Sequence, residues 1–240
     1  MAKERTDNKR LVIYLAQQGG GKTAVCDQLV SRYKAIKINV TPSWKRGPFP
    51  AYADICRHLG DGGPWKSTKA AENAMFRALN NRAPGILALD EGDSLGGESL
   101  NVLKFILNDT RWVIALFTLP ALWDQMRKRT WLYSDQITRR ALAIIDLDER
   151  LIRPGDVAPF MDRFKFNGEA GQIYKLVAEA ANDWGAFDMV ETIAANLDLI
   201  RNGTIPFKDK AAIPQVLHAT AIARKNWRLH RYPPRKKAML

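Results

Sequence analysis

Three consecutive glycines, Gly19-Gly20-Gly21, followed by Lys22 and Thr23, constrain this chain more than any other feature. The run stands between a short apolar segment, Leu11–Leu15, and a helix-forming stretch over residues 22–34. Glycines let successive backbone N–H groups curve around an anion without Cβ clashes, and the following helix directs its positive dipole end at the same place. The order of strand, glycine loop and helix therefore predicts an α/β fold with a phosphate-binding loop.

The chemistry of this loop predicts ATP as the ligand and Mg²⁺ as its counter-ion. The usual P-loop pattern begins with glycine, and Ala16 stands there; a small side chain is tolerated if its φ stays negative. Lys22 is expected to reach the β- and γ-phosphates, and the Thr23 hydroxyl to ligate Mg²⁺. The alternative is a flexible glycine hairpin followed by a chance Lys-Thr. The predicted nucleotide-binding residues are Gln18, Gly19, Gly20, Gly21, Lys22, Thr23 and Ala24.

An acidic pair, Asp90-Glu91, closes another apolar segment, Gly85–Leu89. In a parallel nucleotide-binding sheet the carboxyl ends of the strands line the ligand crevice. We expect Asp90 to hold the Mg²⁺ shell and Glu91 to polarise the water that attacks the γ-phosphate. The alternative is an ordinary turn, because Asp-Glu-Gly-Asp is also favourable loop chemistry. Together the two motifs predict an ATPase.

Strands alternate with helices in the first part of the chain and helices alone follow, which predicts a helix-covered parallel sheet and then a small helical lid. Residues 41–50 are expected to form a loop. The predicted domains are a P-loop core over residues 1–153, a lid over 154–223 and a basic tail over 224–240. Strands are predicted at residues 11–15, 35–40, 85–90, 112–118 and 143–147, and lid helices at 155–164, 168–182, 187–201 and 213–224.

The net charge and the cysteine content restrict the kinds of ligand, partner and environment that we expect for this chain. The net charge is +12, from 37 Lys and Arg against 25 Asp and Glu, and such an excess attracts polyanions such as nucleic acid. A basic protein without such a partner is the alternative. Cys26 and Cys56 lie outside any CxxC or His-rich context, so neither a disulfide framework nor a metal site is expected. No apolar run is long enough to span a bilayer, which favours a cytoplasmic protein without membrane contact.

Three segments carry a resemblance to a known family. They are Leu89-Asp90-Glu91-Gly92-Asp93-Ser94-Leu95, then Ser99–Lys104, and the strand Val113–Thr118 with Leu119-Pro120-Ala121-Leu122 after it. Between about Leu11 and Leu147 the chain resembles the AAA+ superfamily, and more narrowly the DNA-transposition ATPases typified by the B protein of phage Mu. That resemblance implies a ring or helical filament that assembles on duplex DNA with ATP, selects targets and activates a transposase.

The resemblance also implies roles for single residues. Thr118 would be the sensor that bonds the γ-phosphate or the attacking water. Arg139 and Arg140 would supply the arginine that completes a neighbouring subunit's site, with Arg127 and Arg129 as second choices. A guanidinium there would neutralise charge on the transferred phosphoryl group, whereas the alternative is a pair of solvated surface cations. Asp188 stands where many relatives have a lid arginine, which argues against lid sensing of ATP.

Two basic segments are candidate DNA surfaces. In the loop after the second strand, Trp44, Lys45 and Arg46 combine cations for phosphates with an aromatic ring for a sugar or base. Packing of Trp44 beneath the loop is the alternative. About ten residues precede the first strand, so the remaining DNA contacts are expected from the tail. The candidate tail contacts, for which a solvated tail is the alternative, are Arg224, Lys225, Arg228, Arg231, Arg235, Lys236 and Lys237.

Other functions share these motifs. A helicase loader or replication-initiation ATPase has both acidic and glycine motifs and also binds nucleic acid, with a helicase as its partner. A DNA-coating scaffold would bind ATP with little turnover. A P-loop kinase is less favoured, because of the helical second domain, the Asp-Glu pair and the positive charge.

Overall fold

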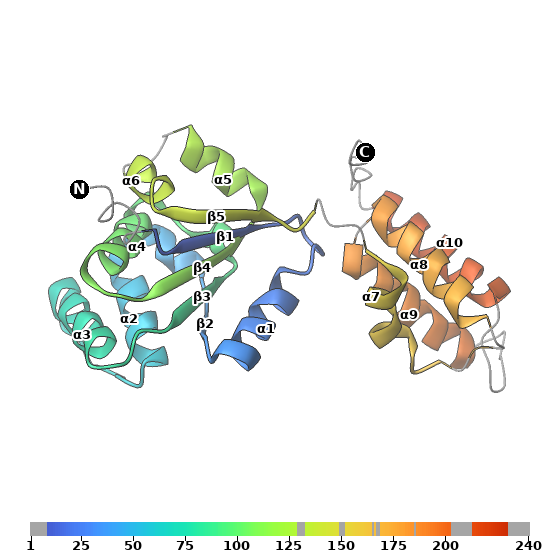
Figure 1. Cartoon of the computed structure of the whole chain (residues 1–240), viewed down its shortest axis with the longest axis horizontal. Helices are drawn as coiled ribbons and strands as arrows, with labels where there is room; N and C mark the ends of the chain where they lie inside the picture. The colour runs from blue at the N-terminus through green and yellow to red at the C-terminus, as the bar shows by residue number, and fades with distance from the viewer. Residues whose placement is uncertain are drawn as a thin grey trace. The chain divides into compact units, whose positions relative to one another are not determined.

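The computed structural model describes residues 9–128, 133–148, 152–164, 166, 169–184, 186–202 and 213–229. These residues form two compact units that divide after Leu147, and residues 18–21 group with the second unit. The first unit holds the sheet and the second is helical (Figure 1).

The first unit is built on one five-stranded parallel sheet with the strand order β2-β3-β4-β1-β5. Its strands are β1 Leu11–Leu15, β2 Ile36–Asn39, β3 Ile86–Asp90, β4 Val113–Thr118 and β5 Ala141–Asp146. This is the predicted fold class, and all five strands lie close to where the sequence placed them. Because the strands are parallel, all five carboxyl ends reach the same edge of the sheet.

Helices cover both faces of this sheet, and the strand residues alternate between two apolar clusters. Leu87 and Leu89 pack in the large core that includes residues of α2, α3 and α4. Ala88, between them, packs with Cys26 of α1 on the opposite face. The helices of this unit are α1 Lys22–Tyr33, α2 Pro48–His58, α3 Thr68–Asn80, α4 Gly97–Asp109, α5 Pro120–Arg127 and α6 Ser134–Thr138, with short 3₁₀ turns η1 Pro42–Arg46 and η2 Gly92–Ser94.

Two sequence predictions need correction here, and two short helices were missed. Residues 41–50 are not a plain loop, since η1 lies within them and α2 starts at Pro48, where a proline favours the first helical turn. The short helices α5 and α6 were not predicted. The last strand begins at Ala141 rather than at Ala143.

The second unit consists of α7 Pro154–Met161, α8 Ala170–Trp184, α9 Ala186–Asn202 and α10 Ile213–Leu229. Its core includes Val177 of α8, Ile193 and Leu197 of α9, and Val216 of α10. The last helix, α10, continues through residues 224–229, beyond the end predicted for it at residue 224. No helix in the described part of the chain combines the length and the apolarity that crossing a bilayer requires.

Candidate active site

The carboxyl ends of β1, β3 and β4 bring the main predicted site residues to one edge of the sheet. In the strand register Leu15 is paired with Thr118, and Leu89 with Leu116, so that β4 lies between the strands that end in the two motifs. The N–H of Ala16 donates to the carbonyl of Thr118 at 3.2 Å. The start of the glycine loop is therefore fixed to the end of β4.

The glycine loop has the backbone that its sequence predicts. Gly19 and Gly21 adopt φ angles of 76° and 82°, in the left-handed region that favours glycine. Ala16 is fully buried and keeps a negative φ, which explains why alanine is tolerated at the first position of the pattern. The Lys22 ammonium donates to the carbonyls of Ala16 at 2.8 Å and Gln17 at 3.0 Å. Lys22 is thus turned back over the loop that precedes it.

Three of the seven predicted nucleotide contacts are exposed to solvent. Gln18, Thr23 and Ala24 are exposed, and Thr23 and Ala24 lie in the first turn of α1. The first N–H groups of a helix have no partner within the helix, so this turn offers donors and a positive dipole end to an anion. The arrangement is suited to phosphate oxygens.

The acidic pair separates into one buried and one exposed carboxylate. Asp90 ends β3 and is 3% exposed, and its Oδ1 accepts the N–H of Glu91 at 3.0 Å. Glu91 is exposed and stands in the left-handed region at φ 58° and ψ 39°. Such a backbone costs a non-glycine residue about 1 kcal/mol and turns the chain sharply at the end of the strand. The turn leaves the Glu91 carboxylate accessible beside a fixed Asp90.

Gly92 allows the chain to pass close to the end of β4, and the sequence analysis did not single it out. A Cβ at this position would stand 2.6 Å from Leu116 Cδ1 and 2.8 Å from the Phe117 carbonyl oxygen. It would also lie 3.1 Å from Thr118 Cβ. Only glycine lets the chain after the acidic pair pass this close to the end of β4. The Asp-Glu-Gly order was the available signal.

Thr118 supplies a buried hydroxyl with an unused hydrogen bond. Its side chain is fully buried, and its Oγ1 has no hydrogen-bond partner among the described residues. Buried hydroxyl groups rarely stay unpaired in folded proteins, because desolvation without a partner is costly. Thr118 therefore suits the expected sensor position, where a ligand oxygen or an ordered water would accept or donate the missing bond.

Lys37 of β2 is a second feature that the sequence analysis missed. Its ammonium lies 2.7 Å from Asp27 Oδ1 of α1 and 3.5 Å from Asp90 Oδ2. Burial opposes the charge, but the hydrogen bond to Asp27 and the nearby negative charges outweigh it and raise the pKa of Lys37. A lysine within a parallel strand, where apolar residues predominate, was the signal that could have revealed it.

Cys26 lies next to this charged group and is fully buried. Burial, followed by the charge of Asp90, raises the pKa of its thiol to about 11. The thiol is therefore protonated at neutral pH and acts as a packing group. Both cysteines of the chain are buried and free.

The residues at this edge fit Mg²⁺ when it is bound together with phosphates. Thr23 and Asp90 offer a hydroxyl and a carboxylate, the oxygen ligands that Mg²⁺ prefers, and the remaining positions are normally taken by phosphates and water. Within the described ranges, no group of three or more His, Cys, Asp or Glu side chains could hold a metal ion without such help.

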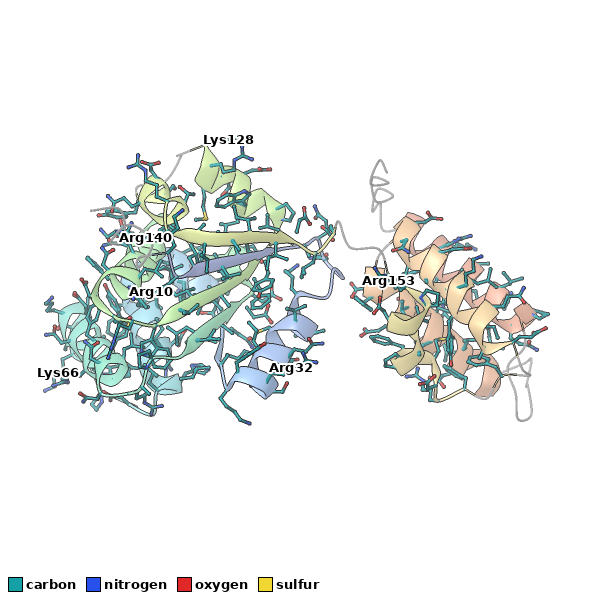
Figure 2. All side chains as sticks on the ribbon, in the orientation of Figure 1. Arg10, Arg32, Lys66, Lys128, Arg140 and Arg153 are labelled. Atoms are coloured by element: carbon teal, nitrogen blue, oxygen red, sulfur yellow. The ribbon has the colours of Figure 1, made fainter. Side chains whose placement is uncertain are left out.

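The two arginines proposed to act in trans lie at the opposite edge of the sheet. The N–H of Leu11 donates to the Arg140 carbonyl at 3.3 Å, so these arginines stand where the strands begin, and Figure 2 labels Arg140 and Arg10 there. The side chain of Arg140 bonds Asn108 and the Gln136 carbonyl. Neither arginine reaches the acidic pair of its own chain.

Arg139 and Arg140 differ in how they are held. The Arg139 side chain is 72% exposed, and its ion pair among the described residues is with Asp135, one helical turn away, at 2.7 Å. Arg140 fixes the start of β5 to α4 and α6 through several bonds. Arg139 is therefore the better candidate for a contact with another chain. Of the second choices, Arg127 is exposed at the end of α5 and Arg129 lies outside the described residues.

The predicted DNA role of Trp44 is wrong. Its side chain is 0% exposed, and its indole N–H donates to Asp54 Oδ2 at 2.7 Å. The Ser99 hydroxyl also donates to the Trp44 carbonyl, which fixes η1 to the start of α4. A ring buried in this way cannot stack on a base. Lys45 and Arg46, by contrast, are exposed and stay candidates for phosphate contacts.

The basic residues near the end of the chain are partly described. Arg224 is half-buried in α10, 3.9 Å from Asp183 Oδ2, and Lys225 is exposed. The backbone of Arg228 lies in α10, whereas Arg231, Arg235, Lys236 and Lys237 lie outside the described residues. Their role as DNA contacts stays a prediction.

A parallel sheet with a glycine loop after β1 and an acidic pair after β3 defines a P-loop nucleotide-binding domain. A family model described as an AAA domain matches residues 5–126, slightly more than half of the chain. The chain therefore belongs to the AAA-domain family. No curated protein matches it.

Solved structures support the same fold. The FIGL-1 AAA domain in complex with ADP has a TM-score of 0.56 at 16% identity, over 90% of this chain and 72% of that one. NtrX from Brucella abortus in complex with ATP has a TM-score of 0.53 at 16% identity. The match covers 89% of this chain and 51% of the NtrX chain. At these identities the likeness concerns the fold alone.

Proposed function

We propose that this chain is an ATPase that binds Mg-ATP at the glycine loop and hydrolyses it with Glu91. The observation that carries the proposal is the position of Lys22. Its ammonium bonds two carbonyls of its own loop, in the turn between β1 and α1. Phosphate oxygens are stronger acceptors for an ammonium than neutral carbonyls are, so an entering triphosphate would draw Lys22 to its β- and γ-phosphates.

The residues at the strand ends would then have separate roles in hydrolysis. Bound Mg²⁺ neutralises negative charge on the phosphate oxygens. Thr23 and Asp90 would hold that ion, and Glu91 would accept the proton of the attacking water. Thr118 would use its unpaired hydroxyl to orient that water or a γ-phosphate oxygen. The buried Asp90 and the exposed Glu91 suit these roles, because only Glu91 is open to solvent.

We further propose that hydrolysis requires a second copy of this chain, with Arg139 as the donor. The two arginines chosen by resemblance stand where the strands begin, away from the acidic pair of their own chain, and Arg139 is exposed there. Head-to-tail contacts would bring the edge of one copy that carries Arg139 to the nucleotide-binding edge of the next copy. Such heterologous contacts generate rings or filaments. Arg139 would then neutralise charge on the transferred phosphoryl group.

The partner that we propose is duplex DNA, and the process is regulation of transposition with a transposase as the protein partner. The net charge of +12 and the exposed cations Lys45 and Arg46 support sequence-tolerant contact with phosphates. The link to transposition is supported by the sequence resemblance between Leu11 and Leu147.

ATP-dependent assembly on DNA tests this function. Electron microscopy of the chain with ATP should show rings or filaments on duplex DNA, and phosphate release should rise with assembly. The Arg139→Ala variant should still bind ATP but should assemble into complexes that turn over slowly, whereas Arg111→Ala, at another exposed arginine, should match the parent. Lone particles on DNA with parental turnover would contradict the proposal of a shared site.

A further inference from the structure

We propose that Lys37 competes with Mg²⁺ for Asp90 and thereby sets the Mg²⁺ concentration at which the site holds ATP. This inference rests on the proposed function and adds a regulating residue to the same site. Lys37 belongs to β2, outside both the glycine loop and the acidic pair. It is a positioning residue, because it acts through Asp90 rather than on the phosphates.

The strand register explains how Lys37 reaches Asp90. Lys37 is paired with Ala88, two residues before Asp90 on β3, and Asn39 is paired with Asp90 itself. Residues i and i+2 of a strand face the same side, so Lys37, Ala88 and Asp90 share the face that α1 covers. Ala88 has a small side chain, which leaves room beneath α1 for the lysine to extend toward the strand end.

The two carboxylates that Lys37 contacts differ in their surroundings. Asp27 Oδ1 lies 2.7 Å from the ammonium, and this carboxylate is 61% exposed. Asp90 Oδ2 lies 3.5 Å from it, and that side chain is 4% exposed. An interaction with a buried carboxylate is less screened by water than one with an exposed carboxylate. Lys37 can therefore influence Asp90 strongly even though its shorter contact is with Asp27.

The two carboxylate oxygens of Asp90 have different contacts. Its Oδ1 accepts the N–H of Glu91, while its Oδ2 faces the Lys37 ammonium. A divalent ion at Asp90 would stand near this fixed positive charge, and like charges at short distance repel. The lysine thus holds the carboxylate in place without metal and also weakens its hold on Mg²⁺.

A purely structural role is the competing explanation. The Lys37–Asp27 pair joins β2 to α1, and such a pair can hold a helix on a sheet without affecting a ligand. The two explanations differ in what the removal of the charge does. Competition predicts tighter Mg²⁺ binding, whereas a structural pair predicts a change in stability alone.

Magnesium titration of nucleotide binding separates these explanations. A fluorescent ATP analogue at fixed concentration is bound to the full chain while Mg²⁺ is increased from an EDTA baseline. In Lys37→Met the Mg²⁺ midpoint should fall by about fivefold to tenfold, because the repulsion is removed while Asp27 had already neutralised part of it. Lys37→Arg keeps the charge and should stay within about twofold of the parent.

Asp27→Asn provides the opposite shift. Without Asp27, the ammonium should turn fully to Asp90 and raise the midpoint, and the double variant with Lys37→Met should behave like Lys37→Met alone. Thermal unfolding checks that each variant folds, and Lys37→Gln replaces Lys37→Met if the latter does not. A midpoint that is unchanged or higher in the neutral variants would overturn the proposal. Failure of the parent to bind the analogue at any Mg²⁺ concentration would instead contradict the proposed ATP site.

Discussion

The turns that follow β1 and β2 leave the same edge of one parallel sheet, yet the sequence predicted them unequally well. After β1, the glycine loop has the expected positive φ angles at Gly19 and Gly21, and Lys22 bonds the carbonyls of Ala16 and Gln17. After β2, the predicted DNA-binding aromatic is buried and anchored to Asp54. The first prediction used backbone chemistry at fixed spacing, and the second used only composition.

This comparison shows which kind of signal specifies a site. Glycines followed by Gly-Lys-Thr restrict the backbone itself, so few other structures are compatible with them. An aromatic residue beside two cations is compatible with a binding surface and also with a core residue under a loop. Burial decides between those alternatives, and burial depends on distant segments such as α2 and α4.

The largest expected effect concerns the acidic pair beside the glycine loop. Glu91→Gln removes the proposed proton acceptor, so ATP turnover should fall about 1000-fold while ATP affinity stays within about twofold. Phosphate release and nucleotide binding measure the two quantities. Glu98→Gln, an exposed glutamate in the first turn of α4, is the matched control and should keep parental turnover. Parental turnover in Glu91→Gln would remove Glu91 from its role.

Substitution of Trp44 tests the turn after β2, where we assign this residue a structural role. Trp44→Ala should lower the free energy of unfolding by about 3–5 kcal/mol, because it leaves a cavity under η1 and removes the bond to Asp54. Chemical denaturation measures this loss. Trp44→Phe keeps most of the volume and should lose less. A Trp44→Ala variant of parental stability with weakened DNA binding would restore the role of Trp44 in binding DNA.

Lys22→Ala tests the charge in the glycine loop. Losing the charge-assisted bonds to phosphate should weaken ATP binding about 50- to 100-fold with little change in stability. Lys66→Ala, an exposed lysine between α2 and α3, is the control for removing one positive charge. Equal ATP affinity in the two variants would show that Lys22 does not contact the nucleotide.

The smallest effect is expected for the exposed cations after β2. The double variant Lys45→Gln with Arg46→Gln should weaken DNA binding by about tenfold or less. The steepness of the plot of log binding constant against log salt concentration should fall by about 2, because each of the two cations would no longer neutralise a phosphate. Binding isotherms at several salt concentrations measure the slope. Lys66→Gln with Lys69→Gln removes the same charge elsewhere and should leave the slope unchanged. Equal slopes in both double variants would exclude the η1 cations from the interface.

Much of the fold was predictable because its signals are local. The apolar runs at β1, β3 and β4 are short, continuous and bounded by turn residues, and the structure confirms each of them. The edge strand β5 was predicted two residues late. Leu142 and Ile144 are 62% and 46% exposed, so its apolar residues do not show the burial pattern of a central strand.

The positions of the candidate site residues were predictable as far as they depend on motifs. The glycine loop, Asp90, Glu91 and Thr118 are all found at strand ends or directly after them. Lys37 and Gly92 could not be assigned in the same way, because their roles depend on neighbours from other elements, namely Asp27 of α1 and Leu116 of β4. Arg139 was chosen by resemblance, and a contact with a second chain is beyond what one chain's pattern specifies.

Calorimetry with Mg-ATP tests the central claim most directly. The Glu91→Gln variant prevents turnover during the titration and leaves the proposed binding groups intact. We predict one ATP bound per chain, with affinity that falls sharply when EDTA removes Mg²⁺ and again when Lys22→Ala is added to this variant. No heat of binding with Mg-ATP, with or without duplex DNA, would contradict the assignment of an ATP site to the glycine loop.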